Sequence, residues 1–234
     1  MKKYFDEYTK AATREYSRFK SWEYVYGYVK NNQGSLLKKS SLEKTALHLG
    51  YYLASWGMFR GGGKLLYMNL EYFKFLSNLL FKEIPKRYPG FYDNTFSDFS
   101  NPEFCHEFDE VIVFIREEMN LGKAPTDTLT SKILLGVWGH VPALDNYFRL
   151  AHKDLLRRSS FKCRSNINLS GASMSELLDL SNHNEWPKLF REVKFSYEGK
   201  IFKYPLAKRI DMAFWQFGFK LVNTRKKALA LNLK

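Results

Sequence analysis

The sequence of 234 residues predicts a mainly α fold, with about eight to ten helices and one short β-hairpin. Apolar residues recur at helical spacing along most of the chain, helix-start signals are frequent, and only one stretch alternates like a strand pair. The length suits one large domain or two small ones. Because the predicted elements are joined by short connections and no internal repeat is present, we expect a single helical domain over 1–234.

The first half of the chain carries two long helical patterns. Residues 41–59 have apolar side chains at helical spacing, and Ser40 with Glu43 is typical of a capping box. Residues 64–84 continue with the same periodicity. Pro85 is expected to end that helix, because proline lacks the N–H that a helix interior needs.

The second half contains further helices and one strand pair. Residues 85–100 mix turn-forming and aromatic residues, which predicts an ordered loop. Asn101-Pro102-Glu103 is a strong helix start, because asparagine caps a helix and proline suits its first turn. Two further helices are predicted, one from Thr126 or Thr128 to Gly139 and one from Pro142 to about Arg158. Ser173 and Glu176 then predict a helix start with a capping box, and a hairpin over 195–204 turns at Glu198-Gly199. The last predicted helix runs from Pro205 to about Phe219, and a basic tail follows from about residue 220.

The composition excludes several classes of protein. A hydrophobic fraction of 45% and an aromatic fraction of 17% exclude a disordered chain. Two cysteines, Cys105 and Cys163, exclude a disulfide scaffold and a four-thiolate zinc site. The N-terminus lacks the apolar segment of a signal peptide, and no apolar run is long enough to span a membrane. We therefore expect a cytoplasmic protein.

The charge of the chain points to a polyanionic partner. It has 37 Lys and Arg against 24 Asp and Glu, a formal charge of +13, which favours nucleic acid first and an anionic membrane surface second. A basic cluster spans 149–164, and its cations at four-residue spacing share one helix face. Phosphate contacts are expected from Arg149, Lys153, Arg157 and Arg158, and from Lys220, Arg225, Lys226, Lys227 and Lys234 in the tail.

A glycine turn is the first candidate for chemistry. Gly61, Gly62 and Gly63 lie between Arg60 and Lys64, directly before a predicted helix. Consecutive glycines mark places where the backbone turns sharply or approaches another group, and a helix N-terminus favours an anion such as phosphate. A plain connector between helices would carry the same residues, and no P-loop spacing follows. The turn is a candidate DNA contact.

The second candidate lies within 131–152. A helix bearing Lys132 ends at Gly139, and Pro142 opens a helix whose first turn includes Asp145. An acid in the first turn is stabilised by the helix dipole without any function. A lysine on a solvated helix face likewise needs no functional explanation. Lys132 and Asp145, each taken alone, therefore have a structural explanation.

Residues 141–145, Val-Pro-Ala-Leu-Asp, resemble the start of the helix that bears the essential aspartate in helix-hairpin-helix DNA glycosylases. This resemblance places Asp145 on the catalytic aspartate, and Lys132 on a lysine that some members carry on the preceding helix. The L-P-G-V-G hairpin of that family is not present, and residues 135–139 match it only in part. The resemblance implies a helix-hairpin-helix glycosylase-like fold.

A family of small bacterial proteins found in defence islands is similar to this chain in three blocks, HLGYYLASWGMFRGG, KILLGVWGHVPALDNYF and YPLAKRIDMAFWQFG. That family includes an anti-phage DNA glycosylase that removes glucosylated hydroxymethylcytosine from phage DNA. The resemblance implies excision of a modified base, which leaves an abasic site that blocks phage replication. It implies double-stranded DNA carrying modified bases as the partner, with no cofactor, metal, membrane or protein partner.

Base excision makes definite demands on side chains. Cleavage of the N-glycosidic bond builds positive charge on the sugar, which a carboxylate such as that of Asp145 stabilises. A base inside a duplex must be flipped out, stacked against aromatic or apolar walls and read at its polar edge. Most aromatic residues in helices simply pack in the core. The candidates for the base pocket are Tyr52, Trp56, Trp138 and Tyr147 for stacking, and His48, Ser55, His140, Asn146 and Gln216 for hydrogen bonds.

Near the C-terminus, residues 203–216 form the third candidate segment. Lys208 and Asp211 lie three residues apart on a predicted helix, which a surface ion pair explains. Asp211, Trp215 and Gln216 are open to a second interpretation, in which they line the pocket.

Two other functions remain open. Residues 93–118 hold eight acids, and carboxylates such as those of Asp109 and Glu110 could bind the metal of a nuclease, although no motif with ligand spacing is present. A non-enzymatic helical module could bind DNA through the basic clusters alone.

Overall fold

The computed structural model describes residues 1–60, 64–119 and 121–232, with side chains as far as Arg225. Within these ranges one hairpin is present, and the rest of the regular structure is helical. The mainly helical fold with one short hairpin is therefore confirmed. The elements are α1 (Lys2–Ala12), α2 (Ser21–Asn31), α3 (Leu42–Ser55), α4 (Leu70–Asn78), α5 (Ile84–Arg87), α6 (Pro102–Glu118), α7 (Asp127–Val137), α8 (Asn146–Arg158), α9 (Gly171–His183), α10 (Trp186–Leu189), β1 (Lys194–Tyr197), β2 (Lys200–Lys203) and α11 (Leu206–Asn232).

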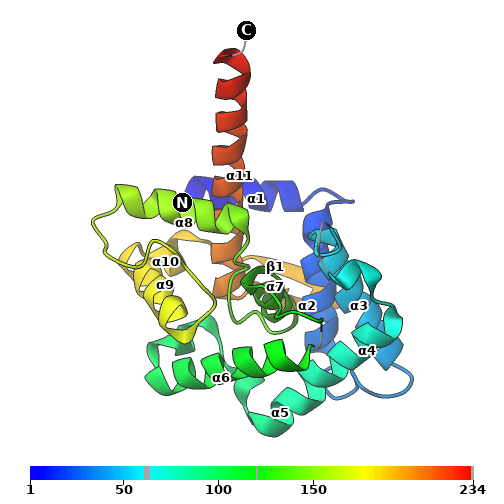
Figure 1. The fold of residues 1–234 in the computed structure, drawn as a ribbon. Helices are drawn as coiled ribbons and strands as arrows, with labels where there is room; N and C mark the ends of the chain where they lie inside the picture. The colour runs from blue at the N-terminus through cyan, green and yellow to red at the C-terminus, as the bar shows by residue number, and fades with distance from the viewer. Residues whose placement is uncertain (61–63, 120, 233–234) are drawn as a thin grey trace.

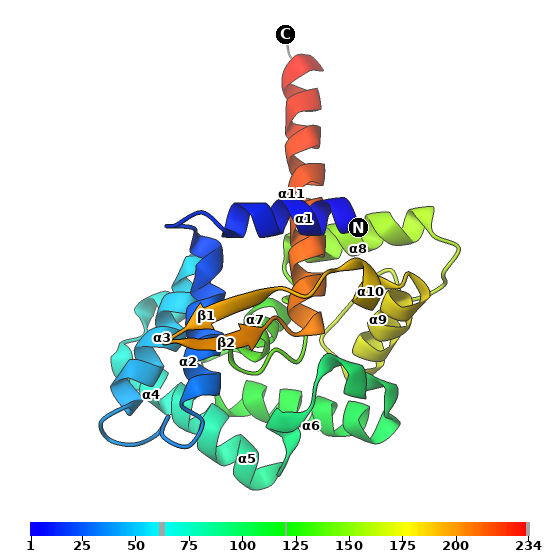
Figure 2. The ribbon, with the colours of Figure 1, turned by 180° about the vertical axis from the view of Figure 1, so that it is seen from behind.

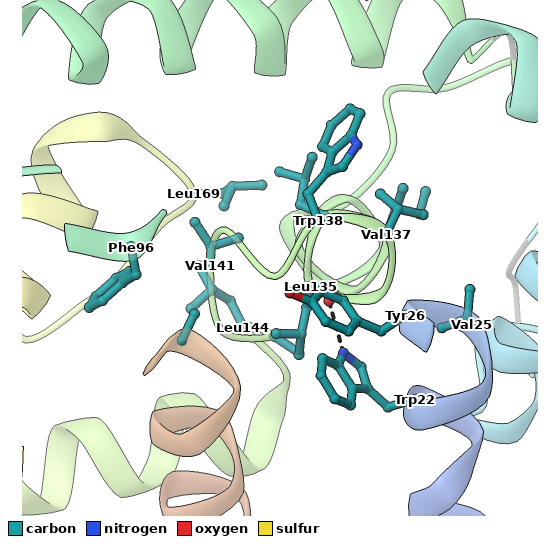
Figure 3. Close-up of a cluster of buried hydrophobic side chains, with 14 of the residues drawn as sticks. Trp22, Val25, Tyr26, Phe96, Leu135, Val137, Trp138, Val141, Leu144 and Leu169 are labelled. Atoms are coloured by element: carbon teal, nitrogen blue, oxygen red, sulfur yellow. Dashed lines mark hydrogen bonds between the residues drawn. The ribbon is translucent and has the colours of Figure 1, made fainter. Parts of the chain in front are cut away.

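Helix α7 lies at the centre of the fold, with the other helices around it (Figures 1 and 2). Residues 129–137 of this helix are all buried, and a helix buried on every side is typical of a core. Figure 3 shows part of that core, where the indole N–H of Trp22 donates a hydrogen bond of 2.8 Å to the carbonyl of Leu135. The buried apolar side chains form one continuous cluster.

Helix α11 packs against α1 and α8, and its C-terminal half projects beyond both (Figures 1 and 2). The approach to α8 is close at Gly218, where a Cβ atom would overlap the carbonyl oxygen of Tyr147. The predicted helix end near Phe219 is wrong. The helix continues to Asn232, because no glycine or proline follows Gly218 and the Lys, Arg, Ala and Leu residues there favour helix.

Neither predicted capping box forms. Helix α3 follows Ser41 rather than Ser40, and Ser41 makes no side-chain cap. Helix α9 follows Ser170, whose hydroxyl accepts a hydrogen bond from the N–H of Ser173, so Ser173 lies inside the helix. Serine is frequent near both starts, and the capping position is set by where the backbone leaves its extended conformation.

The helix predicted over 64–84 is interrupted and does not end at Pro85. A 3₁₀ turn over Lys64–Tyr67 comes first, and α4 starts after Asn69, whose side chain caps it. A π-helical segment over Leu79–Glu83 then leads into α5. Pro85 lies in the first turn of α5, where its missing N–H is tolerated.

The hairpin agrees with the prediction, and so does the loop except at its start, where residues 85–87 belong to α5. Residues 88–100 contain two 3₁₀ turns, Phe91–Asp93 and Phe96–Ser100, held by buried phenylalanines. The hairpin pairs Lys194 with Lys203 and turns at Glu198 and Gly199. Both turn residues have positive φ, as this turn requires.

Candidate active site

Asp145 lies at the start of α8 as its capping residue. The predicted helix start at Pro142 is wrong, because the backbone is still extended at Asp145. Oδ1 of Asp145 accepts a hydrogen bond of 3.0 Å from the N–H of Phe148. This bond satisfies one N–H group of the first helical turn, which leaves the second carboxylate oxygen for another partner.

Lys132 supplies that partner from the middle of α7. Its Nζ lies 3.3 Å from Oδ2 of Asp145, and only 3% of the lysine side chain and 15% of the aspartate side chain are exposed. The ring centroid of Trp56 lies 5.0 Å from the same Nζ, which adds a cation–π contact. The expectation that Lys132 lies on a solvated helix face is therefore wrong. Because α7 is buried on all sides, its lysine side chain lies inside the protein and needs these partners.

The turn before Asp145 is fixed by side chains of α7 and α11. The N–H of Ala143 donates to Oδ1 of Asp211 at 3.1 Å, and the N–H of Leu144 donates to Oγ of Ser131 at 2.9 Å. The carbonyl of Leu144 accepts a hydrogen bond of 2.9 Å from Oγ1 of Thr128. These bonds hold the backbone next to Asp145, so the carboxylate has a defined position.

A second ion pair, Lys208 with Asp211, lies behind the first. The two side chains are 2% and 6% exposed, and Nζ of Lys208 lies 2.8 Å from Oδ2 of Asp211. The predicted surface ion pair is therefore wrong, because this face of α11 packs into the core beside α1 and α2. Burial lowers the pKa of Lys208 despite the neighbouring aspartate, and the charge of Lys132 acts in the same direction.

Lys132 and Asp145 both line an open pocket of about 670 Å³. Its walls come from the end of α3, from α7, from the first turns of α8 and from α11. The lining residues are Trp56, Met58, Thr128, Lys132, Asp145, Asn146, Tyr147, Leu150 and Val222. The pocket thus combines one ion pair with aromatic and apolar walls.

Trp56 is held firmly in the wall of this pocket. Its indole N–H donates a hydrogen bond of 3.1 Å to Oγ of Ser21. The cationic groups of Arg18, Lys132 and Lys208 all lie within 5.4 Å of its ring centroid. Trp215 packs edge-on against it, with ring centroids 5.9 Å apart. The ring is therefore in place before any ligand arrives.

Tyr147 and Asn146, from the first turn of α8, complete the predicted residues in the pocket. Tyr147 packs edge-on against Trp215 at 5.3 Å, and the side chain of Asn146 is exposed. Tyr52 lies behind the pocket, where its hydroxyl donates a hydrogen bond of 3.1 Å to the carbonyl of Lys132. Burial raises the pKa of Tyr52 well above its ordinary value.

Trp138 and His140 do not reach this pocket. Their rings stack on each other at 5.4 Å, and both pack against Phe91. Trp138 lines a separate cavity of about 340 Å³ with Phe81 and Tyr92. His140 is fully buried, and burial lowers its pKa to about 3. The turn after α7 carries these two side chains away from Asp145.

Three predicted hydrogen-bonding residues also lie elsewhere. His48 stacks on Tyr28 with ring centroids 4.1 Å apart, and burial lowers its pKa. The hydroxyl of Ser55 donates to the carbonyl of Tyr51 within its own helix. Gln216 donates to Glu7 of α1. None of the three lines the Asp145 pocket.

Arg60 and Lys64 line a neighbouring pocket of about 360 Å³ that shares Met58 and Thr128 with the first. The predicted contacts at Gly61, Gly62 and Gly63 lie outside the described residues.

Arg149 is an internal link rather than a free cation. Its guanidinium donates to the carbonyl of Leu144 at 3.1 Å, to Oδ2 of Asp127 at 2.9 Å and to the carbonyl of Ile167. Asp127 also pairs with Arg116. Arg149 is therefore not available for phosphate, although it was predicted to share one helix face with other cations of α8.

The other predicted cations of α8 lie on the surface. Lys153 and Arg157 are exposed, and Arg158 pairs with Asp154 at 2.9 Å. Lys153 and Arg157 follow Leu150 by three and seven residues, so they continue the stripe of α8 that lines the pocket. Lys220 pairs with Glu7 of α1, and Arg225 is exposed. The side chains of Lys226 and Lys227, and all of Lys234, lie outside the described residues.

Sequence reasoning missed four residues of the pocket: Met58, Thr128, Leu150 and Val222. Leu150 could have been found, because it lies one helical turn after Asn146. Val222 could not, since the final helix was expected to end before it. Met58 and Thr128 carry no pattern that marks them.

The structure bears on the alternative of a metal-dependent nuclease and on the expected absence of a membrane span. Within 1–60, 64–119 and 121–232, no three His, Cys, Asp or Glu side chains come together as a metal-binding group. Asp109, a candidate nuclease ligand, instead accepts a hydrogen bond of 2.7 Å from the N–H of Gly171. Among the described helices, none has the length and apolar character needed to cross a membrane.

Comparisons of the chain with protein-family models, with curated proteins and with solved structures found no match.

Proposed function

We propose that the protein is a DNA glycosylase that excises a modified base, with Asp145 as the essential carboxylate. The observation that carries this proposal is the ion pair of Asp145 with the buried Lys132 at the wall of an aromatic pocket. A paired charge at a cavity is costly to build and is frequent at functional sites. The resemblance of residues 141–145 to the aspartate segment of helix-hairpin-helix glycosylases supports the same assignment.

The carboxylate is oriented for this chemistry on both sides. Oδ1 of Asp145 caps α8 through the N–H of Phe148, and Oδ2 is paired with Lys132. When the bond between the base and C1′ of the sugar breaks, positive charge develops on the sugar ring. A fixed carboxylate beside the ring stabilises that charge as the base departs. Water adds its hydroxyl to C1′, and the proton that the water gives up balances the proton that the departing base takes up.

Lys132 acts in this proposal as a cation. Its ammonium is paired with Asp145 and lies over the ring of Trp56, so it has no free electron pair for attack on the sugar. Its positive charge holds the carboxylate of Asp145 in place. Water is then the group that adds to C1′, which leaves a simple abasic site.

The pocket suits a base that has been flipped out of the duplex. Trp56 and Tyr147 supply aromatic surfaces, and Asn146 supplies an exposed amide for the polar edge of the base. Its volume of about 670 Å³ is within the range of small-ligand sites. From the family resemblance, we propose that the substrate is glucosylated hydroxymethylcytosine in double-stranded phage DNA. We propose that the protein acts in anti-phage defence in the bacterial cytoplasm.

A non-enzymatic DNA-binding module is the second candidate. It is favoured by one observation, that Asp145 is already paired with Lys132 and already caps α8. In that case both residues would stabilise the fold, and the exposed Lys153 and Arg157 would bind phosphate without chemistry.

Incubation of the purified protein with glucosylated phage DNA distinguishes the glycosylase from the non-enzymatic DNA-binding module. The glycosylase releases free base and leaves abasic sites, in the presence of EDTA as well as without it. A binding module leaves the DNA unchanged while its affinity falls steeply with salt.

A further inference from the structure

The second pocket, beside Asp145, holds a cluster of cations. We infer that it binds a phosphate of the DNA strand that carries the excised nucleotide, an inference that rests on the proposed function. The pocket has a volume of about 360 Å³ and shares Met58 and Thr128 with the Asp145 pocket. Thr128 also bonds to the carbonyl of Leu144, the residue before Asp145. The two pockets are therefore direct neighbours.

Three cations from separate segments line this second pocket. Arg60 follows α3, Lys64 begins the 3₁₀ turn and Lys123 lies in the loop before α7. All three are exposed, and none forms an ion pair with an acid of the described chain. No Asp or Glu is among the described residues of the lining. Cations without an internal partner are available to an external anion.

The first turn of α7 borders the same pocket, and its one acid, Asp127, pairs with Arg116 and Arg149 and is not among the lining residues. Thr126 and Thr128, at the N-terminus of the helix, both line the pocket. The positive end of the helix dipole favours an anion at this point. The rest of the lining is apolar, with Leu65 and Leu129 among its residues.

The chemistry of the lining selects a phosphate over the substituent of a modified base. A glucosyl group is uncharged and its hydroxyls need acceptors as well as donors, whereas the three cations of this pocket only donate. In DNA, a phosphate lies directly next to every sugar. A cationic pocket adjacent to Asp145 is therefore in place for a phosphate that flanks the flipped nucleotide.

Neutral replacement of single phosphates tests this inference. The probe is a duplex with a tetrahydrofuran abasic analogue in place of the modified nucleotide, so that no bond is cleaved. One methylphosphonate is placed in turn at each phosphate around the analogue. The unsubstituted protein is expected to lose affinity about tenfold when a flanking phosphate is neutral.

Two triple variants make the test specific. The pocket variant, Arg60→Gln with Lys64→Gln and Lys123→Gln, should bind the all-phosphate duplex more weakly and show no further loss at the flanking methylphosphonate. The control variant removes the same charge from exposed lysines outside the pocket, Lys38→Gln with Lys39→Gln and Lys200→Gln, and should keep the tenfold loss. All substitutions are on the surface, and circular dichroism checks that the fold is retained.

The inference is overturned if the pocket variant still loses affinity at the same methylphosphonate. It is also overturned if methylphosphonates have no effect and the pocket variant instead loses its preference for glucosylated over plain hydroxymethylcytosine in excision, because the pocket would then hold the substituent. Excision of the modified base by the unsubstituted protein is measured in parallel. Absent excision with an intact phosphate effect refutes the glycosylase and leaves a phosphate site in a DNA-binding protein.

Discussion

Lys132 and Asp145 are 13 residues apart in the chain, and their side chains meet at 3.3 Å. The lysine lies in a helix that is buried on every side, whereas the aspartate caps the next helix at the wall of a pocket. A buried ammonium is thereby held against a carboxylate that a ligand can reach. The proposed chemistry depends on this relationship.

Two replacements of Asp145 distinguish the contribution of its helix-capping hydrogen bond from that of its charge. Asparagine caps helices as well as aspartate does, so Asp145→Asn should keep the cap of α8, whereas Asp145→Ala should lose about a further 1 kcal/mol of unfolding free energy. Urea denaturation measures the difference. Equal stability of the two variants would contradict a capping role for Oδ1.

Replacement of Lys132 tests its role as a cation. Lys132→Gln should lower the rate of excision at least about 100-fold, and Lys132→Arg should retain more of it, because arginine keeps the charge beside Asp145. Treatment with borohydride during the reaction should trap no covalent complex of the protein with DNA. A trapped complex that is lost in both variants would show instead that Lys132 attacks the sugar.

The buried pair of Lys208 and Asp211 should be costly to break singly. Asp211→Asn leaves the ammonium of Lys208 buried without a counter-charge, which is expected to lower the unfolding free energy by about 3–5 kcal/mol. The double variant Lys208→Met with Asp211→Asn removes both charges and should be more stable than the single variant. Chemical denaturation of both proteins checks this, and a double variant less stable than Asp211→Asn would rule it out.

The basic side chains of α8 should differ in what their replacement changes, which is DNA affinity for some and stability for others. Lys153→Gln with Arg157→Gln should reduce the slope of log affinity against log salt by about 2, with the thermal midpoint unchanged, because both side chains are exposed. Arg149→Gln should lower the thermal midpoint, since it removes bonds to Leu144 and Asp127. DNA titrations at several salt concentrations and thermal scans distinguish them. A changed salt slope in Arg149→Gln alone would reverse the assignment.

The buried His140 should make stability depend on pH. Its pKa falls from an ordinary 6.5 to about 3 in the folded protein, so the unfolded chain binds a proton first as the pH falls. The contribution to stability is complete above about pH 6.5 and decreases by about 1.4 kcal/mol per pH unit below that, until the folded protein also binds the proton. His140→Phe should have a shallower pH dependence between pH 6 and 4, measured by urea denaturation. An unchanged slope would mean that His140 is already protonated in the fold.

Much of the helical fold could be predicted from local signals. The asparagine cap and proline before Glu103 start α6 as expected, and Glu198-Gly199 turns the hairpin. The ends of helices were harder to predict. The continuation of α11 beyond Phe219 depends on the absence of breakers and on residues that favour helix, and no specific stop or start signal marks it. Val222 was missed at the pocket for this reason.

The candidate site could be predicted only where a resemblance located it. That resemblance singled out Lys132 and Asp145, and the structure brings them together. Helical spacing showed that Lys208 and Asp211 are neighbours, but spacing does not say which face of a helix is buried. The aromatic candidates were chosen without knowledge of tertiary packing, and Trp138 lies on another side of α7.

A single-turnover excision assay tests the central claim most directly. The substrate is a duplex with one glucosylated hydroxymethylcytosine, and the proteins are the unsubstituted chain and Asp145→Asn, with folding verified by the urea transition. The unsubstituted protein is predicted to release the base and leave an alkali-labile site, and Asp145→Asn to do so at least about 100-fold more slowly while still binding the duplex. Equal rates for the two proteins, or bound DNA from which neither releases a base, would contradict the assignment of Asp145.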